Sequence, residues 1–186
     1  MIDRAVFDEL YRGGADPWRF ATSRYEARKR AITLASLTRP RYGVAFEPGC
    51  ALGHLTELLA PRCARLHAID VSGRAVARAR RRVRAPHVVV EQGALPECWP
   101  EERLDLVVLS ELGYFLDAAE LDAVAERCAD GLVPGGDLVA VHWRGPIEGY
   151  PLDGADVHAA LAARTELLRT VRHEEPEFLL EVFRRA

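Results

Sequence analysis

Residues 44–53 read Val-Ala-Phe-Glu-Pro-Gly-Cys-Ala-Leu-Gly, an apolar run that passes into a loop bounded by two glycines. Residues 44–46 predict a short buried strand, and residues 52–60 predict the helix that follows it. Gly49 and Gly53 suit a loop that passes close beneath a ligand, because glycine lets the backbone approach and the next helix directs N–H groups toward the site. Glu47, at the carboxyl end of the strand, can offer an acceptor to a cationic group.

Strands and helices alternate along the rest of the chain. Further strands are predicted at residues 65–69, 87–90, 104–109 and 138–141. One helix is predicted after Ser72, a second opens at Asp117, and a third spans residues 156–163. Because parallel neighbours need crossover helices, this order predicts an α/β fold with a mostly parallel sheet. Two last strands, 166–171 and 178–183, are too close for a crossover and predict an antiparallel hairpin. The expected fold is Rossmann-like and doubly wound, with seven strands and this terminal hairpin.

The N-terminal residues 1–42 are predicted to form a helical cap before a core of residues 43–186, within one domain overall. Val6, Leu10 and Tyr11 mark a first amphipathic helix. The Ser23-x-x-Glu26 spacing of a capping box predicts a second helix that runs to about Thr38.

Composition excludes several classes of protein. The 186 residues are 49% apolar and 28% charged, as in ordinary globular proteins. A net charge of −3 gives no general attraction to nucleic acid. The first ten residues lack the apolar core of a signal peptide and no run is long enough to span a bilayer, so a cytoplasmic protein without membrane contact is expected. The four cysteines, at positions 50, 63, 98 and 128, are too far apart for a zinc site or a disulfide framework and are expected to be buried thiols; no metal is predicted.

An arginine-rich run, residues 74–84, lies in a segment with helical spacing. Such a run is more typical of a solvated outer helix face than of a binding patch.

The second predicted strand ends at Asp70, about 20 residues beyond Gly49, where a carboxylate is suited to accept the hydroxyls of a ribose. The spacing Gly49-x-x-x-Gly53 lacks the G-x-G-x-x-G pattern that a pyrophosphate requires. A dinucleotide-dependent dehydrogenase is therefore the weaker interpretation. S-adenosylmethionine, which has no phosphate, is the stronger one.

The order and spacing of segments 44–56, 70–72, 105–110 and 132–136 resemble the cofactor-binding motifs of class I methyltransferases. Further segments resemble the nodulation protein S family, which N-methylates the free amine of a de-N-acetylated chitooligosaccharide. These segments are Asp16-Pro17-Trp18, Ser23-x-Tyr25-Glu26, Glu47-Pro48-Gly49-Cys50, Ser110-Glu111-x-x-Tyr114 and Val141-His142-Trp143-Arg144. Two positions depart from the general pattern. Ala51 replaces the central loop glycine, and Ala94 replaces an aspartate that holds adenine, so cofactor affinity is in question.

The resemblance implies a set of cofactor-binding residues and a small-molecule acceptor, an amino sugar or oligosaccharide. An N-terminal helix is expected over the bound cofactor, where aromatic rings would exclude water and Arg28 would pair with the carboxylate of the cofactor. In the competing interpretation, Trp18 is a core residue and Arg28 a surface residue. The implied cofactor residues are Trp18, Tyr25, Arg28, Glu47, Gly49, Cys50, Gly53, Asp70, Val71, Ala94, Leu95 and Ser110.

The acceptor side is expected at the carboxyl ends of the fourth and fifth strands. An aliphatic ammonium must lose a proton before it can attack a methyl group, which calls for a carboxylate or imidazole nearby. Glu111 is the leading candidate to bind the amine or take its proton, and His142 is the second; a capping or structural role remains open for each. Tyr114, Trp143 and Arg144 are candidate substrate-binding residues, whereas His54, His67, His87, His158 and His173 show no partner spacing and are predicted to be structural.

Two alternatives remain. One is an O-methyltransferase of a small natural product, and the other is a non-catalytic module that binds S-adenosylmethionine. A methyltransferase acting on amines of nucleic-acid bases would carry an Asn/Asp-Pro-Pro-aromatic run where Ser110-Glu111-Leu112-Gly113-Tyr114 stands, so a nucleic-acid substrate is not expected.

Overall fold

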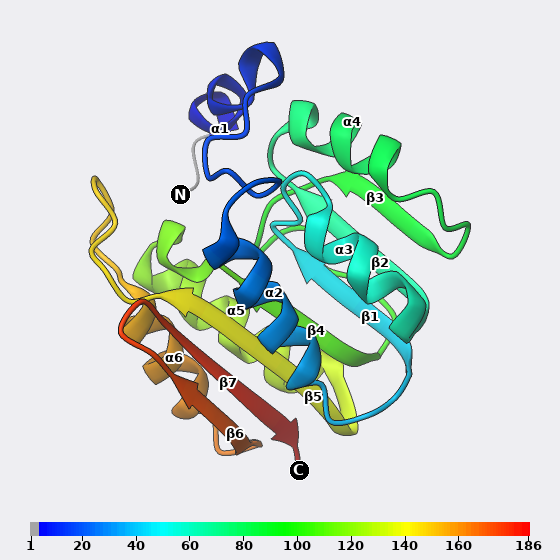
Figure 1. Ribbon diagram of the computed structural model, residues 1–186. Helices are drawn as coiled ribbons and strands as arrows, with labels where there is room; N and C mark the ends of the chain where they lie inside the picture. Colours follow the sequence, from blue (N-terminus) through cyan, green and yellow to red (C-terminus); the bar gives the residue numbers. More distant parts are fainter. Residues whose placement is uncertain (1–3) are drawn as a thin grey trace. The chain divides into compact units, whose positions relative to one another are not determined.

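A computed structural model describes residues 4–186 of the chain (Figure 1). It has two compact units, a first unit of residues 4–94 and a second unit of residues 95–186. The described part of the predicted N-terminal cap, residues 4–42, lies within the first unit. Its separation from the core at residue 43 stays a prediction.

The first unit contains three parallel strands in the order β3-β2-β1. They are β1 (Tyr42–Pro48), β2 (Cys63–Asp70) and β3 (Val88–Gln92). Glu47 is level with Ala68, and Asp70 is level with Gln92. The carboxyl ends of the strands therefore share one edge of this unit, which is the edge where ligands bind in folds of this kind.

Four α-helices accompany these strands: α1 (Arg4–Leu10), α2 (Arg24–Ala35), α3 (His54–Leu59) and α4 (Gly73–Arg82). Ser23 and Ser72 cap α2 and α4 through their side chains, as predicted. α2 ends at Ala35, three residues before the predicted Thr38. α3 starts two residues later than predicted, since Gly53 has a φ of 77°.

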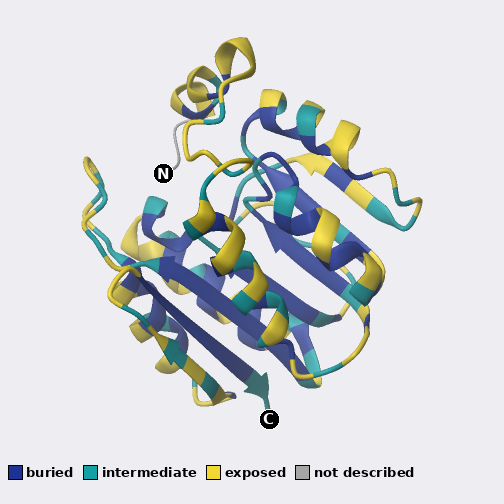
Figure 2. Cartoon of the chain, viewed as in Figure 1, coloured by how far each residue is buried: buried dark blue, intermediate teal, exposed yellow. Residues whose placement is uncertain are grey.

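The second unit contains β4 (Leu104–Ser110), β5 (Leu132–Trp143), β6 (Leu167–Glu174) and β7 (Phe178–Arg185). The order is β4-β5-β7-β6, with β4 and β5 parallel and with β7 antiparallel to both of its neighbours. The predicted terminal hairpin is therefore confirmed. Figure 2 shows β4, β5 and β7 as almost continuously buried, whereas most of β6 is exposed or half-buried.

Two helices complete the second unit, α5 (Ala118–Gly131) and α6 (Gly154–Ala162). Both begin with capping boxes, Asp117 with Glu120 and Asp153 with Asp156. The Asp153 cap explains why α6 starts two residues earlier than predicted. The buried side of α5 has helical spacing and consists of Leu121, Val124, Ala125, Cys128 and Ala129.

One prediction about this unit needs correction. The strand predicted at residues 138–141 starts earlier, at Leu132. Residues 134–136 therefore lie inside β5, where the register against β4 shifts between Leu104 and Leu106. Gly135, with a φ of 75°, lets the strand absorb the extra residues as a bulge.

Candidate cofactor and acceptor sites

The loop between β1 and α3 makes a tight turn on three left-handed residues. Gly49, Ala51 and Gly53 have φ values of 74°, 49° and 77°. A Cβ atom on Gly53 would lie 3.0 Å from the Cα atom of Ala79 on α4, so glycine is needed there both for its conformation and for helix packing. Ala51 adopts the left-handed conformation that the loop requires at this position, although it is not a glycine.

Asp70, at the end of β2, is held by this loop. Its Oδ2 accepts a hydrogen bond from the N–H of Ala51 at 2.9 Å, and its Oδ1 accepts one from the N–H of Ser72 at 2.9 Å. Burial raises the pKa of Asp70 to about 6, although these two hydrogen bonds oppose the rise. The structure thus brings together the two motifs that the sequence placed about 20 residues apart.

Glu47 is the most deeply buried carboxylate of this edge, with 2% of its surface exposed. Burial raises its pKa to about 8, an effect that the neighbouring Thr56 hydroxyl partly offsets. Its Oε2 atom has no hydrogen-bond partner among the described residues. A buried acceptor of this kind is costly unless a ligand donates to it.

The N-terminal segment forms an aromatic cluster. The ring of Trp18 lies 5.7 Å from the rings of both Tyr11 and Phe20, and Trp18 keeps 38% of its surface exposed. Arg78 of α4 donates to the carbonyl of Ala15, which ties the segment to the first unit. Trp18 therefore packs in an aromatic cluster and is partly exposed, and its role at a cofactor stays a prediction.

The remaining predicted cofactor residues have diverse surroundings. The ring of Tyr25 lies beneath the ammonium of Lys29 at 4.8 Å, and Arg28 is exposed on the same helix. The carbonyl of Val71 accepts a hydrogen bond from the Gln92 side chain at 2.8 Å. Cys50 and Leu95 are buried, whereas Ala94 and Ser110 are half-buried at the ends of their segments.

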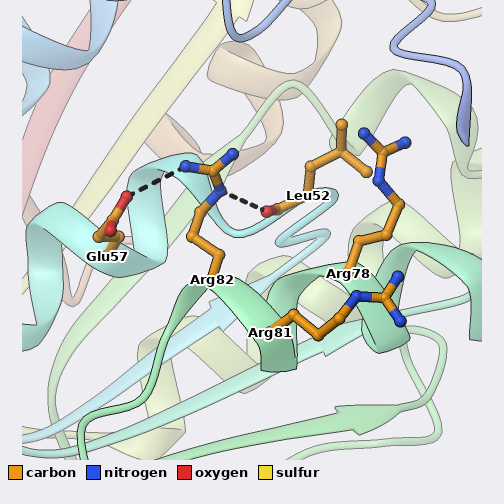
Figure 3. Close-up of a pocket in the computed structure, with 5 residues that line it drawn as sticks. All are labelled: Leu52, Glu57, Arg78, Arg81 and Arg82. Atoms are coloured by element: carbon orange, nitrogen blue, oxygen red, sulfur yellow. Dashed lines mark hydrogen bonds and ion pairs between the residues drawn. The ribbon is translucent and has the colours of Figure 1, made fainter.

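The arginine-rich helix α4 borders a surface hollow of about 340 Å³ (Figure 3). Leu52, Glu57, Arg78, Arg81 and Arg82 line it. Arg82 donates to the carbonyl of Leu52 at 3.1 Å and pairs with Glu57 at 3.3 Å. Arg78, Arg80 and Arg82 donate to neighbouring backbone carbonyls, and most of the run is exposed, as on an outer helix face.

Of the four cysteines predicted to be buried thiols, Cys98 is exposed and the other three are buried.

In the second unit, Glu111 follows β4 with a left-handed φ of 54°. Its N–H donates to the carbonyl of Val141 at 2.8 Å, and its Oε2 accepts from the N–H of Trp143 at 3.0 Å and from the hydroxyl of Tyr114. A non-glycine residue in this conformation costs about 1–2 kcal/mol. The half-buried carboxylate is thus fixed between the ends of two strands, with Tyr114 beside it as predicted.

His142 is fully buried near the end of β5. Its Nε2 lies 3.4 Å from the N–H of Gly113, and its ring meets the ring of Tyr114 edge-on at 5.5 Å. Its role as a base stays a prediction, but this position favours a supporting role behind the Glu111–Tyr114 turn.

His158, which shows no partner spacing in the sequence and was predicted to be structural, has two buried hydrogen-bond partners. Its Nε2 lies 3.2 Å from Nδ1 of His142, and its Nδ1 lies 2.8 Å from Oε2 of Glu181. Sequence spacing does not reveal the contact, because it joins β5, α6 and β7. A single glutamate inside the apolar run 178–183 was the available signal.

Arg144 points to the hairpin turn. Its guanidinium donates to the carbonyl of Glu175 at 2.7 Å and pairs with Glu174 at 3.0 Å. Trp143 is half-buried, and its ring folds back over Gly145, where a Cβ atom would meet it. The structure thus brings Glu111, Tyr114 and Trp143 together and gives Arg144 another environment; a substrate role for Arg144 stays a prediction.

The described residues contain no group of three or more His, Cys, Asp or Glu side chains arranged to hold a metal ion. None of the helices in residues 4–186 is long and apolar enough to cross a membrane.

Comparisons with known proteins identify relatives of the chain. A Nodulation protein S of Rhizobium tropici is 39% identical over 127 residues, 67% of this chain and 53% of the relative. The crystal structure of N-methyltransferase NodS from Bradyrhizobium japonicum, in complex with S-adenosyl-L-homocysteine, has a TM-score of 0.88 at 29% identity and covers 98% of each chain. A structure from Pseudomonas syringae is 46% identical with a TM-score of 0.76, over 87% of this chain and 99% of that one.

These likenesses confirm the predicted α/β fold of class I methyltransferases. The chain spans about half the length of the curated relative from Rhizobium tropici and 59% of one from Sinorhizobium fredii. The family model of Nodulation protein S (NodS) matches residues 8–170. The chain belongs to the Nodulation protein S family.

Proposed function

We propose that this chain is an S-adenosylmethionine-dependent N-methyltransferase whose acceptor is the free amino group of a glucosamine-containing oligosaccharide. Its family membership supports the proposal, as does its likeness to a relative described as an N-methyltransferase in complex with S-adenosyl-L-homocysteine. The observation that carries it is the Glu111 carboxylate, fixed by two donors in a strained turn.

Glu47 and Asp70 are the residues that fit the cofactor. An ammonium group would complete the buried Oε2 of Glu47, which has no other partner among the described residues. Each oxygen of Asp70 accepts one backbone N–H and keeps capacity for a second donor, such as a ribose hydroxyl. The bound cofactor supplies the activated methyl group, so the protein does not have to generate an electrophile.

Glu111 binds the acceptor as an ammonium and then takes its proton. Loss of the proton gives the amine nitrogen the lone pair that it needs to attack the methyl carbon. The two donors on Oε2 orient the carboxylate before the acceptor arrives, which lowers the cost of ordering during the reaction.

A carboxylate in this position also selects against other acceptors. It attracts a cationic amine and repels an acceptor that is itself a carboxylate. Trp143 and Tyr114 flank Glu111. The half-buried Trp143 would meet the sugar to which the amine is attached, whereas Tyr114, with 4% of its surface exposed, orients the carboxylate. The acceptor class is therefore a primary amine, and the O-methyltransferase alternative is the less favoured one.

The test is a methyl-transfer assay on matched acceptors. A chitin oligomer with one free glucosamine amine is compared with the same oligomer fully N-acetylated, and with a phenol and a carboxylic acid. We expect turnover only on the free amine. Turnover on the phenol instead would support the O-methyltransferase alternative. Binding of S-adenosylhomocysteine without turnover on any acceptor would support a non-catalytic module.

A further inference from the structure

A line of buried polar groups runs through the second unit behind Glu111. It starts at the N–H of Gly113, passes through His142 and His158 at separations of 3.4 and 3.2 Å, and ends 2.8 Å farther on at Glu181. His142, His158 and Glu181 have 0%, 4% and 1% of their surfaces exposed. The proposed reaction uses none of these side chains directly.

Both ends of the line have a fixed polarity. A backbone N–H can only donate a hydrogen bond, so Gly113 is the donor at its end of the line. At the other end, Oε1 of Glu181 accepts from Arg169 at 2.8 Å and from Arg172 at 2.7 Å. Burial acts to raise the pKa of Glu181, but His158 and the two guanidiniums outweigh it and the pKa is lowered. Glu181 is therefore an ionised carboxylate, which can only accept.

Because one end of the line can only donate and the other can only accept, the two imidazoles can arrange their protons in one way. His158 donates from Nδ1 to Glu181, and its Nε2 then accepts from Nδ1–H of His142. The Nε2 of His142 is left with a lone pair, which accepts from Gly113. The hydrogen-bond network assigns these tautomers.

The Gly113 end of the line supports the turn that carries Glu111. Gly113 is packed so closely against α6 that a Cβ atom on it would lie 2.6 Å from Val157, the neighbour of His158. Tyr114, the next residue, donates to Glu111 and packs its ring against His142. The position of the catalytic carboxylate is thus coupled to the state of the buried histidines.

We propose that His158 and Glu181 are positioning residues, which hold His142 in its Nδ1–H tautomer and thereby fix the turn that presents Glu111 to the acceptor. This inference rests on the proposed function for the role of Glu111. The hydrogen-bond order itself can be tested without any activity.

The decisive variant is Glu181→Gln, which keeps the shape of the side chain. Arg169 and Arg172 hold the amide oxygen in the place of Oε1, so the amide NH₂ faces His158 and donates to it. The line then reverses, and His142 is protonated at Nε2, opposite the N–H of Gly113. We expect nitrogen-15 NMR of labelled protein to show the proton of His142 move from Nδ1 to Nε2.

The same variant should lower kcat by about 10- to 100-fold, because a misplacement of a reacting group by about 1 Å can cost about 100-fold in rate. The affinity for S-adenosylhomocysteine should not change, because Glu47 and Asp70, the two residues that fit the cofactor, lie in the first unit and are not part of this line. Asp137→Asn is the matched control: Asp137 is a fully buried carboxylate paired with Arg184 at 3.0 Å, and it is not part of the line. It should lower thermal stability but leave both kcat and the His142 tautomer unchanged.

A second pair of variants keeps the test decisive if Glu181→Gln fails to fold. In His158→Gln the amide can accept from His142 and donate to Glu181 in the native order, whereas His158→Leu can do neither. We expect activity to survive in the first and fall in the second. The proposal is overturned if His142 carries its proton on Nε2 in the wild type, or if His158→Leu retains full kcat. Absence of methyl transfer by the wild type would instead refute the proposed function.

Discussion

The two units treat their buried carboxylates in opposite ways. In the first unit, Glu47 is buried with an oxygen that no described residue satisfies, and burial raises its pKa to about 8. In the second unit, Glu181 is as deeply buried but accepts from His158 and two arginines, and its pKa is lowered.

This difference indicates different uses. A site that a ligand completes leaves its acceptor unsatisfied until the ligand binds, whereas a scaffold that must hold a residue in place satisfies its own groups. The first unit is therefore suited to a cofactor that comes and goes. The second is suited to presenting Glu111 in a fixed position.

The largest expected effect concerns Glu111. The substitution Glu111→Gln removes the proton acceptor but preserves the shape of the side chain, so we expect kcat to fall about 100- to 1,000-fold. Titration calorimetry should show unchanged affinity for S-adenosylmethionine. Glu126→Gln, on the exposed side of α5, is the control and should be fully active. If Glu111→Gln lost cofactor binding and kept its turnover, Glu111 would belong to the cofactor site.

A smaller effect, on binding, is expected in the first unit. The substitution Glu47→Gln should weaken S-adenosylmethionine binding about 10- to 100-fold, because a charge-assisted hydrogen bond to a buried ammonium is lost. Calorimetry measures this directly. An unchanged affinity would show that the ammonium binds elsewhere and would remove the contrast between the two units.

The same variant tests the pH dependence of stability. Glu47 has a folded-state pKa of about 8 against an ordinary value of 4.5. Above pH 4.5 the unfolded chain loses this proton while the folded chain retains it, so stability is lost as pH rises from about 4.5 to about 8. Near pH 8, ligand-free Glu47→Gln should be more stable than the wild type by about 2–4 kcal/mol. Denaturant unfolding at pH 5 and pH 8 gives both values, and equal pH slopes would contradict the assignment.

Packing in the second unit supplies the next prediction. In Gly113→Ala the new methyl group would meet Val157 at 2.6 Å, and such overpacking costs about 1–3 kcal/mol. A lower melting temperature and a lower kcat should appear together. In the double variant with Val157→Ala, space for the methyl group returns, so the two substitutions should be less destabilising together than their sum. Strict additivity would show that the turn is not held against α6.

The smallest effect is expected at Ala51 in the first unit. Its left-handed φ of 49° strains an alanine, and glycine would relieve that strain while adding flexibility to the unfolded chain. Ala51→Gly should raise stability by about 0.5 kcal/mol, or about 1–2 °C in melting temperature. A loss of stability would mean that the alanine methyl group packs usefully against Leu52 and Tyr11.

The sequence alone determined the order of strands and helices, the closing hairpin, the caps at Ser23 and Ser72, and the loop with its distant partner Asp70. These features depend on local periodicity, on turn and cap chemistry and on spacing between successive strand ends, all of which are written along the chain. The bulge at residues 134–136 escaped prediction because glycine and proline mark a turn and a bulge alike.

Only the tertiary structure decided which buried polar groups meet. His142, His158 and Glu181 come from a strand, a helix and a second strand, and the antiparallel placement of β7 beside β5 brings the glutamate to the histidines. The same folding leaves Glu47 unsatisfied and gives Glu181 three partners, although both are single glutamates beside apolar residues in the sequence. Burial and hydrogen-bond partners depend on which elements pack together, and that pairing is not encoded in local spacing.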